Sequence, residues 1–169
     1  MCINVNKTRL ININFKLSKI EIKAIEEQKM HYQDSRAVSI EALKIVQKIR
    51  GWVSDDSIYA ISEILNIPAH DVEEVATFYS NIYRKPVGRH IIKYCDSMVC
   101  YITGYMEIKL MLETLLAIEP GKTTIDNRFT LLPTCCLGCC DQSPVMMIDD
   151  DTYFNLKKEQ IPYLLEKYK

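Results

Sequence analysis

Cysteine is the residue type that most limits how this chain can fold. Four of its seven cysteines lie within six positions of one another, in the stretch TCCLGCC at residues 134–140. The N-terminal stretch lacks the apolar core and the cleavage site of a signal peptide, so we expect a reducing cytosol, where disulfides are rare. The number of cysteines is also odd. These features predict that the thiols bind a metal or carry out redox chemistry.

A second group of thiols comes earlier in the chain. Cys95 and Cys100 are separated by four residues. Both cysteine regions directly follow short segments that are typical of β-strands, RHIIKY at 89–94 and RFTLL at 128–132. Loops at the ends of two strands of one sheet can face each other. This arrangement predicts four thiolates collected around one small cofactor.

Several kinds of site are compatible with four such thiols. Structural zinc sites favour tight pairs, although gaps of up to about four residues occur. A 2Fe-2S cluster is a longer object than one zinc ion, so looser pairs on separate loops suit it. The spacing alone favours zinc and iron–sulfur about equally, and it ranks a disulfide or a thiol enzyme well behind them.

The composition narrows the classes of partner. The formal net charge is −1 and no basic stripe occurs, so we expect no nucleic acid partner. No apolar run approaches the ~20 residues that span a bilayer, so we expect no direct membrane span. The sequence also lacks a G-x-G-x-x-G turn, which argues against a nicotinamide or flavin site in this chain.

The first half of the chain has a helical period. Ser18 and Glu21 predict a capping box at the start of a helix that continues to about residue 32, and Gly51 ends a second helix that begins near residue 35. Further helices are predicted over 54–66 and 68–79. Side chains predicted to face the core include Ile22, Ile25, Met30, Val38, Ala42, Leu43, Ile45, Val46 and Ile49. Because the turns between the later helices are short, we predict a four-helix bundle over 18–82, preceded by a loose arm at 1–17.

The pattern changes after a linker-like stretch at 85–88. Strands are predicted at 89–94, 128–132, 145–148 and 152–156, with helices at 103–117 and 160–168. Pro133 is expected to stop the second strand, and the first of these helices is expected to turn Ile108, Leu112 and Leu115 inward. We therefore predict an α+β chain in which the helical bundle precedes an α/β domain at 86–169.

Longer motifs carry a resemblance to a known family. The segment HIIKYCDSMVC, followed by CLGCC within LLPTCCLGCCDQSPVMMI, resembles the thioredoxin-like 2Fe-2S ferredoxin family. The likeness extends over about 18–169. The segments SIEALKIVQKIRGWVSD, VEEVATFYSNIYRKPVGRH and IPYLLEKYK are most similar to family members that serve NADH-quinone oxidoreductase, respiratory complex I. The corresponding components of NAD-linked hydrogenases and formate dehydrogenases are less similar.

The resemblance implies a thioredoxin-like fold for residues 86–169 and one 2Fe-2S cluster. The family pattern places the cluster ligands at Cys95, Cys100, Cys136 and Cys140. It leaves Cys135, just before a ligand, without that role. Cys139 fills a position that varies in the family, where another residue type is more usual.

The resemblance also implies a function. The chain would be an electron-transfer subunit of an oxidoreductase that acts as a translocase, without a complete active site of its own. Its cluster would exchange electrons with the flavin of a partner subunit that oxidises NADH. It would lie in the cytoplasm, held at the inner face of the cell membrane through the complex. The alternatives are a 2Fe-2S subunit of an NAD-linked hydrogenase or formate dehydrogenase, and a structural zinc module that binds partners.

Overall fold

The computed structural model describes residues 15–168. The chain divides into two compact units, the first ending at Pro86 and the second beginning at Val87. Helices and a four-stranded sheet together make a mixed α and β protein, as predicted. None of the helices in the described part of the chain has the length and apolar character needed to span a bilayer.

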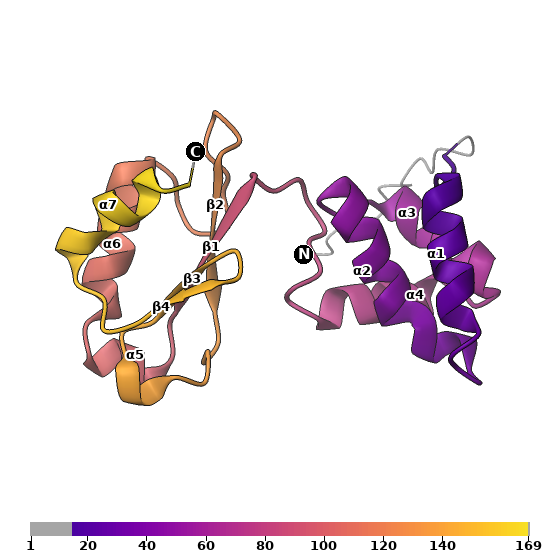
Figure 1. Cartoon of the computed structure of the whole chain (residues 1–169), viewed down its shortest axis with the longest axis horizontal. Helices are drawn as coiled ribbons and strands as arrows, with labels where there is room; N and C mark the ends of the chain where they lie inside the picture. Colours follow the sequence, from indigo (N-terminus) through magenta and orange to yellow (C-terminus); the bar gives the residue numbers. More distant parts are fainter. Residues whose placement is uncertain (1–14, 169) are drawn as a thin grey trace, which may run out of the picture. The chain divides into compact units, whose positions relative to one another are not determined.

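All regular secondary structure in the described part of the first unit is helical (Figure 1). Its elements are α1 (Lys19–Lys29), the 3₁₀-helix η1 (Ser35–Val38), α2 (Ser39–Arg50), α3 (Asp55–Leu65) and α4 (Ala69–Phe78). These helices share one apolar core, which contains Ile25, Val38, Leu43, Val46, Ile61, Leu65 and Val72. The arrangement of the four α-helices as a bundle stays a prediction.

Local signals in the sequence define where these helices begin and end. Ser18 and Glu21 form the predicted capping box, with Glu21 Oε2 2.6 Å from the Ser18 backbone N. Gly51 closes α2 with a left-handed φ of 82°, where a side chain would be strained. Ser54 caps α3 by accepting a hydrogen bond from the Ser57 N–H. Each of these three helix ends therefore satisfies backbone groups that would otherwise lack a partner.

Three apolar residues predicted to face the core do not. Ile22, Met30 and Ile49 are all exposed. The side chain that α1 buries beside Ile25 is instead Glu21, which is 0% exposed. The prediction was wrong because it assumed that apolar spacing alone selects the buried face, whereas an ion pair selects it here.

The segment before α1 is only partly described. Phe15 packs against the helical core, and Leu17 is buried in it. These two residues belong to the stretch predicted as a loose arm, and their contacts tie it to the helices. The rest of that stretch, residues 1–14, lies outside the described residues.

The buried carboxylate of Glu21 is neutralised by Arg50 at the end of α2. The guanidinium donates from Nε to Oε1 over 2.5 Å and from Nη2 to Oε2 over 2.7 Å. The hydrogen bonds from Arg50 lower the pKa of Glu21 to about 2. A two-pronged pair of this kind fixes the position of α1 on α2, because neither charge can be left in the core without the other.

The second unit contains a mixed sheet with strand order β2-β1-β3-β4. Its strands are β1 (His90–Cys95), β2 (Phe129–Thr134), β3 (Met146–Ile148) and β4 (Asp151–Tyr153). The central strand β1 pairs with β2 in parallel and with β3 antiparallel, and β3 pairs with β4 antiparallel. A parallel pair needs a long crossover connection, and residues between β1 and β2 supply it.

Helices cover this sheet. The crossover carries α5 (Met98–Ile102) and α6 (Tyr105–Leu116), and the chain ends with α7 (Ile161–Glu166). Figure 1 shows α6 and α7 side by side along the sheet, and the two helices contact each other. Short 3₁₀-helices lie at η2 (Cys140–Gln142) and η3 (Lys158–Gln160). The shared core contains Ile92, Tyr94, Ile108, Leu112, Leu131, Met146, Ile148 and Ile161.

Several predictions for this unit need correction. The second strand does not stop at Pro133 but continues to Thr134. It can do so because β2 is an edge strand, where a missing N–H costs no sheet hydrogen bond. Leu115 is exposed rather than inward. The short helix α5 was not predicted, since five residues are too few to establish a helical period.

We expect Arg50→Met to destabilise the first unit by about 3 kcal/mol, because the change leaves the buried Glu21 carboxylate without its partner. Lys44→Met is the control, since Lys44 on the same helix makes an exposed ion pair with Glu41, and its loss should cost less than about 1 kcal/mol. Urea unfolding followed by the fluorescence of Trp52, the single tryptophan, measures both changes. Equal destabilisation by the two substitutions would contradict this account.

The same ion pair predicts a pH dependence. The folded pKa of Glu21 is about 2 against a usual 4.5, so the stability it contributes is complete above about pH 4.5. That stability, about 3 kcal/mol, is lost as the pH falls towards 2 because the unfolded chain takes up the proton first. Urea titrations of Trp52 fluorescence across this range should show the decline. Glu21→Gln should remove that part of the slope, and an unchanged slope in this variant would refute the assignment.

Candidate metal centre

The sheet brings the two cysteine loops to one side, where β1 and β2 both end. In the parallel pair, Cys95 at the end of β1 lies opposite Thr134 at the end of β2. The Asp96 N–H donates to the Thr134 carbonyl over 3.1 Å, directly beyond this last pair. Because parallel strands end on the same side, the loops that follow begin next to each other. The expectation that both loops leave one edge of the sheet is confirmed.

The first loop supplies two buried thiols. Cys95 is 2% exposed and Cys100, within α5, is 1% exposed. The turn of α5 returns the chain so that the Cys100 thiol lies beside the Cys95 thiol. Burial, with the neighbouring Cys95 thiol, raises the pKa of Cys100. For Cys95, burial also favours the neutral thiol, but hydrogen bonds from Ser97, the Leu137 N–H and the Cys100 side chain together lower the pKa.

The second loop holds a close pair. Cys136 Sγ lies 3.3 Å from Cys140 Sγ. Gly138, between them, has a φ of 85° and directs its N–H at Cys136 Sγ over 3.4 Å. This N–H, followed by the Cys140 side chain, lowers the pKa of Cys136. The left-handed glycine thus gives the loop the turn that places a backbone donor on sulfur.

Contacts between the loops join the two pairs. The Leu137 N–H of the second loop hydrogen bonds to the Cys95 sulfur. Burial raises the pKa of Cys95, and this hydrogen bond helps those from Ser97 to lower it. The negative charge of a Cys95 thiolate in turn disfavours ionisation of the Cys136 and Cys140 thiols. The second loop therefore reaches the first at Cys95.

The remaining cysteines of the second loop are placed differently. Cys135 is exposed. Cys139 is half-buried, and its sulfur lies 3.8 Å from the Leu137 carbonyl oxygen. Both side chains lie on the same short loop as the Cys136–Cys140 pair. Adjacent positions on a tight loop point in different directions, so proximity in sequence does not make all four thiols equivalent.

Ser97 is a site residue that the sequence analysis missed. Its Oγ lies 3.1 Å from Cys95 Sγ. It occupies the N-cap position of α5 in an extended conformation. The signal that could have found it is a serine directly before a short helix in CDSMVC, but α5 itself was not predicted.

The donor chemistry suits a sulfur-ligated centre. Thiolates select zinc, copper(I) and iron–sulfur clusters over hard cations such as magnesium. Among residues 15–168, no group of three or more Cys, His, Asp or Glu side chains converges as a ready-made site for a single ion. The four thiols predicted as ligands nevertheless provide the number and type of ligand that a 2Fe-2S cluster needs.

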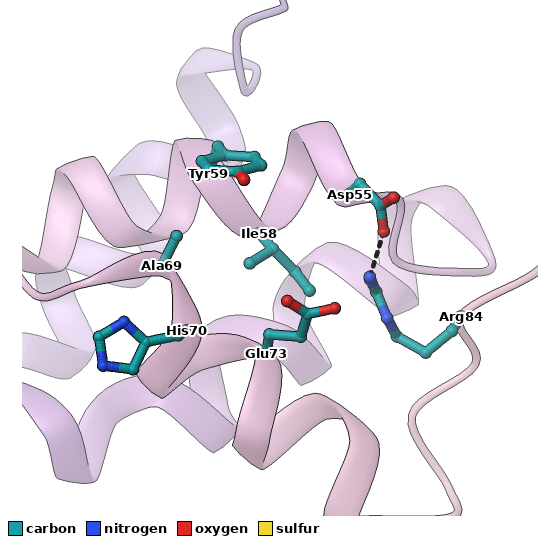
Figure 2. A pocket seen from close by; sticks show the side chains of 7 residues that line it. All are labelled: Asp55, Ile58, Tyr59, Ala69, His70, Glu73 and Arg84. Atoms are coloured by element: carbon teal, nitrogen blue, oxygen red, sulfur yellow. Dashed lines mark hydrogen bonds and ion pairs between the residues drawn. The ribbon is translucent and has the colours of Figure 1, made fainter. Parts of the chain in front are cut away.

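The first unit has a pocket of about 260 Å³. Figure 2 shows Asp55 directed at Arg84, and it shows Tyr59, His70 and Glu73 among the other side chains that line the pocket. Arg84 forms an ion pair with Asp55 and also donates to the Val53 carbonyl over 2.7 Å. These contacts join the end of the helical unit to the start of α3. None of the described residues that line the pocket is a cysteine, so we place the candidate site at the two cysteine loops.

A family model for thioredoxin-like [2Fe-2S] ferredoxins matches residues 25–169. The chain belongs to the thioredoxin-like [2Fe-2S] ferredoxin family. Membership confirms the predicted cofactor, one 2Fe-2S cluster. The match includes most of the helical unit as well as the whole of the unit that contains the sheet.

Similar proteins indicate which members of the ferredoxin family this chain most resembles. The E subunit of the NADH-quinone oxidoreductase of Salmonella typhimurium is 66% identical over 155 residues, which cover 92% of this chain and 93% of that protein. The E subunit of the same oxidoreductase in Buchnera aphidicola is 65% identical over 159 residues, or 94% of this chain and 98% of that protein. These relatives confirm the prediction of an oxidoreductase subunit.

A solved structure supports the fold of this ferredoxin family member. A chain of an NAD⁺-reducing [NiFe]-hydrogenase in the H₂-reduced state aligns with a TM-score of 0.64 and 26% identity. The alignment covers 75% of this chain but only 22% of the hydrogenase chain. The hydrogenase chain is therefore much longer than the part that resembles this protein.

Proposed function

We propose that this chain is the electron-transfer subunit of an NADH-quinone oxidoreductase, respiratory complex I, and that Cys95, Cys100, Cys136 and Cys140 hold its 2Fe-2S cluster. The observation that carries the proposal is the parallel pairing of β1 with β2, because it brings the loops bearing these thiols to one edge of the sheet. The 66% identity to the E subunit of the Salmonella typhimurium oxidoreductase supports the choice of complex.

The two loops give the four thiolates different surroundings. Cys95 and Cys100 are buried, so they keep water from one side of the centre. Cys136 is exposed and Cys140 is half-buried, so the other side is open to a partner. When bound, the 2Fe-2S cluster supplies a reversible one-electron oxidation and reduction of iron. The protein contributes the ligands, the shielding and the orientation.

Backbone donors adjust the charge at the sulfur atoms. The N–H groups of Leu137 and Gly138 point at Cys95 and Cys136, and each stabilises negative charge on sulfur. Asp96 and Asp141, one on each loop, act in the opposite direction because a second negative charge nearby disfavours a further one. The balance of these donors and charges would set how readily the bound cluster accepts an electron.

The surface around the first cysteine loop suits a protein partner. Met98, Tyr101 and Ile102 of α5 are exposed, with Met98 71% and Ile102 76% accessible. Met106 and Leu110 of α6 are exposed as well. Aromatic side chains and methionine are enriched at protein interfaces. We assign the surface to the partner subunit that binds NADH and flavin, whose reduced flavin would donate one electron at a time.

The proposal also specifies where the chain works. Its relatives carry the name of an NADH-quinone oxidoreductase. We propose that other peripheral subunits hold this chain at the inner face of the cell membrane, on the cytoplasmic side. The complete complex would pass the electrons to quinone and couple their transfer to translocation.

The domain arrangement is part of the same proposal. We propose that residues 18–82 form a four-helix bundle and that residues 86–169 form the thioredoxin-like domain that carries the cluster. The shared apolar core of α1 to α4 supports the first assignment. The sheet with its covering helices and both cysteine loops supports the second.

A second candidate function is the 2Fe-2S subunit of an NAD-linked hydrogenase. The hydrogenase structure supports it, but at 26% identity and over 22% of that chain. A formate dehydrogenase would use the same kind of subunit.

We expect Cys136→Ser and Cys100→Ala to lose most of the visible iron–sulfur absorption, because each removes one of four thiolate ligands. The controls are Cys135→Ser and Cys139→Ala, which change thiols of the same loop and should leave the cluster assembled. Absorption spectra with iron and acid-labile sulfide counts measure all four. A normal cluster in Cys136→Ser or in Cys100→Ala would overturn the ligand assignment.

We expect the chain, reduced with dithionite, to give the paramagnetic resonance signal of one reduced 2Fe-2S cluster, with two irons and two sulfides per chain. One zinc without sulfide would overturn the proposal. In the complex isolated through a tag on this chain, NADH should elicit the same signal and a quinone should remove it. Copurification with hydrogenase activity would favour the second candidate.

A further inference from the structure

We propose that Ser97 tunes the reduction potential of the centre through a hydrogen bond from its hydroxyl to the sulfur of Cys95. This inference rests on the proposed ligand set. Ser97 would be a positioning residue rather than a catalytic one, because it acts on the iron through a ligand sulfur. Its hydroxyl would make the centre easier to reduce.

The contact itself is short. Ser97 Oγ lies 3.1 Å from Cys95 Sγ. A thiolate has no proton to give, so once Cys95 binds iron the hydroxyl must be the donor. A donor to a ligand sulfur stabilises added negative charge, and hydrogen bonds to the sulfurs are among the factors that set iron–sulfur potentials.

The usual structural role of a serine at this position is not in use. Ser97 is the N-cap of α5, with a φ of −74° and a ψ of 167°. An N-cap serine normally accepts a hydrogen bond from an N–H in the first helical turn, which contributes ~1 kcal/mol. The Ser97 side chain makes no such hydrogen bond. The hydroxyl is therefore directed at sulfur instead of stabilising its own helix.

The surroundings of Ser97 strengthen this contact. Ser97 is half-buried, so water is partly excluded from the contact. A hydrogen bond that is partly shielded from water is electrostatically stronger than one in bulk solvent.

Substitution of Ser97 in the full chain tests the proposal. Ser97→Ala removes the hydroxyl, and Ser97→Gly removes it while keeping a residue that is well accepted at an N-cap. We expect each variant to assemble the cluster, with iron and sulfide contents equal to the parent. The equilibrium constant for reduction should fall about tenfold, which corresponds to a midpoint potential more negative by about 59 mV.

Two controls isolate the hydroxyl. Ser97→Thr keeps a donor and should restore the midpoint close to that of the parent. Thr103→Val removes a hydroxyl from the other end of α5, where it donates to the Val99 and Cys100 carbonyls over 3.0 and 3.2 Å, and it should leave the midpoint unchanged. Redox titration followed by paramagnetic resonance measures every variant.

The outcomes separate this inference from the function on which it rests. A parent chain without a 2Fe-2S signal refutes the proposed function, before any variant is compared. A parent with the signal, and a hydroxyl-free variant with the same midpoint, overturns the role of Ser97 alone. If Ser97→Ala fails to retain the cluster, the midpoint of Ser97→Gly decides in the same way. An equal shift in Thr103→Val would also overturn the inference.

Discussion

The parallel pairing of β1 with β2 is the constraint on which the site depends. Six consecutive residue pairs join the strands, from His90 opposite Phe129 to Cys95 opposite Thr134. If β2 ran antiparallel to β1, the loop after β2 would begin beside the first residue of β1, a strand length from Cys95. The crossover through α5 and α6 makes the parallel direction possible. It also carries Cys100 and Ser97, so one connection supplies both the pairing and part of the site.

The two cysteine loops divide the requirements of electron transfer between them. The first loop lies in the protein, with Cys95 and Cys100 almost fully buried. The second is a tight turn around Gly138 that leaves Cys136 exposed. Burial lowers the local dielectric and strengthens every hydrogen bond to sulfur. Exposure lets a partner protein approach the centre closely. The Leu137 N–H of the second loop reaches Cys95 of the first, whose sulfur also lies 3.1 Å from the Ser97 hydroxyl oxygen.

Sequence reasoning was most successful where a local signal had a local consequence. The capping box at Ser18 and the glycine stop at Gly51 are both present as predicted. It was wrong where a distant partner changed the outcome. Glu21 is buried because Arg50, far along the chain, neutralises it. Pro133 stays within β2 because the strand lies at the sheet edge, a position that spacing along the chain does not reveal.

The sequence by itself determined the chemistry of this protein, because the number, type and spacing of its thiols, with the motifs around them, are written in residue order. It also determined most helix ends, since caps and glycines act on their own neighbours. The tertiary structure alone decided that β1 and β2 are parallel neighbours and that the Ser97 hydroxyl turns from its helix to sulfur. Both depend on contacts between segments, or on a helix too short to leave a periodic pattern.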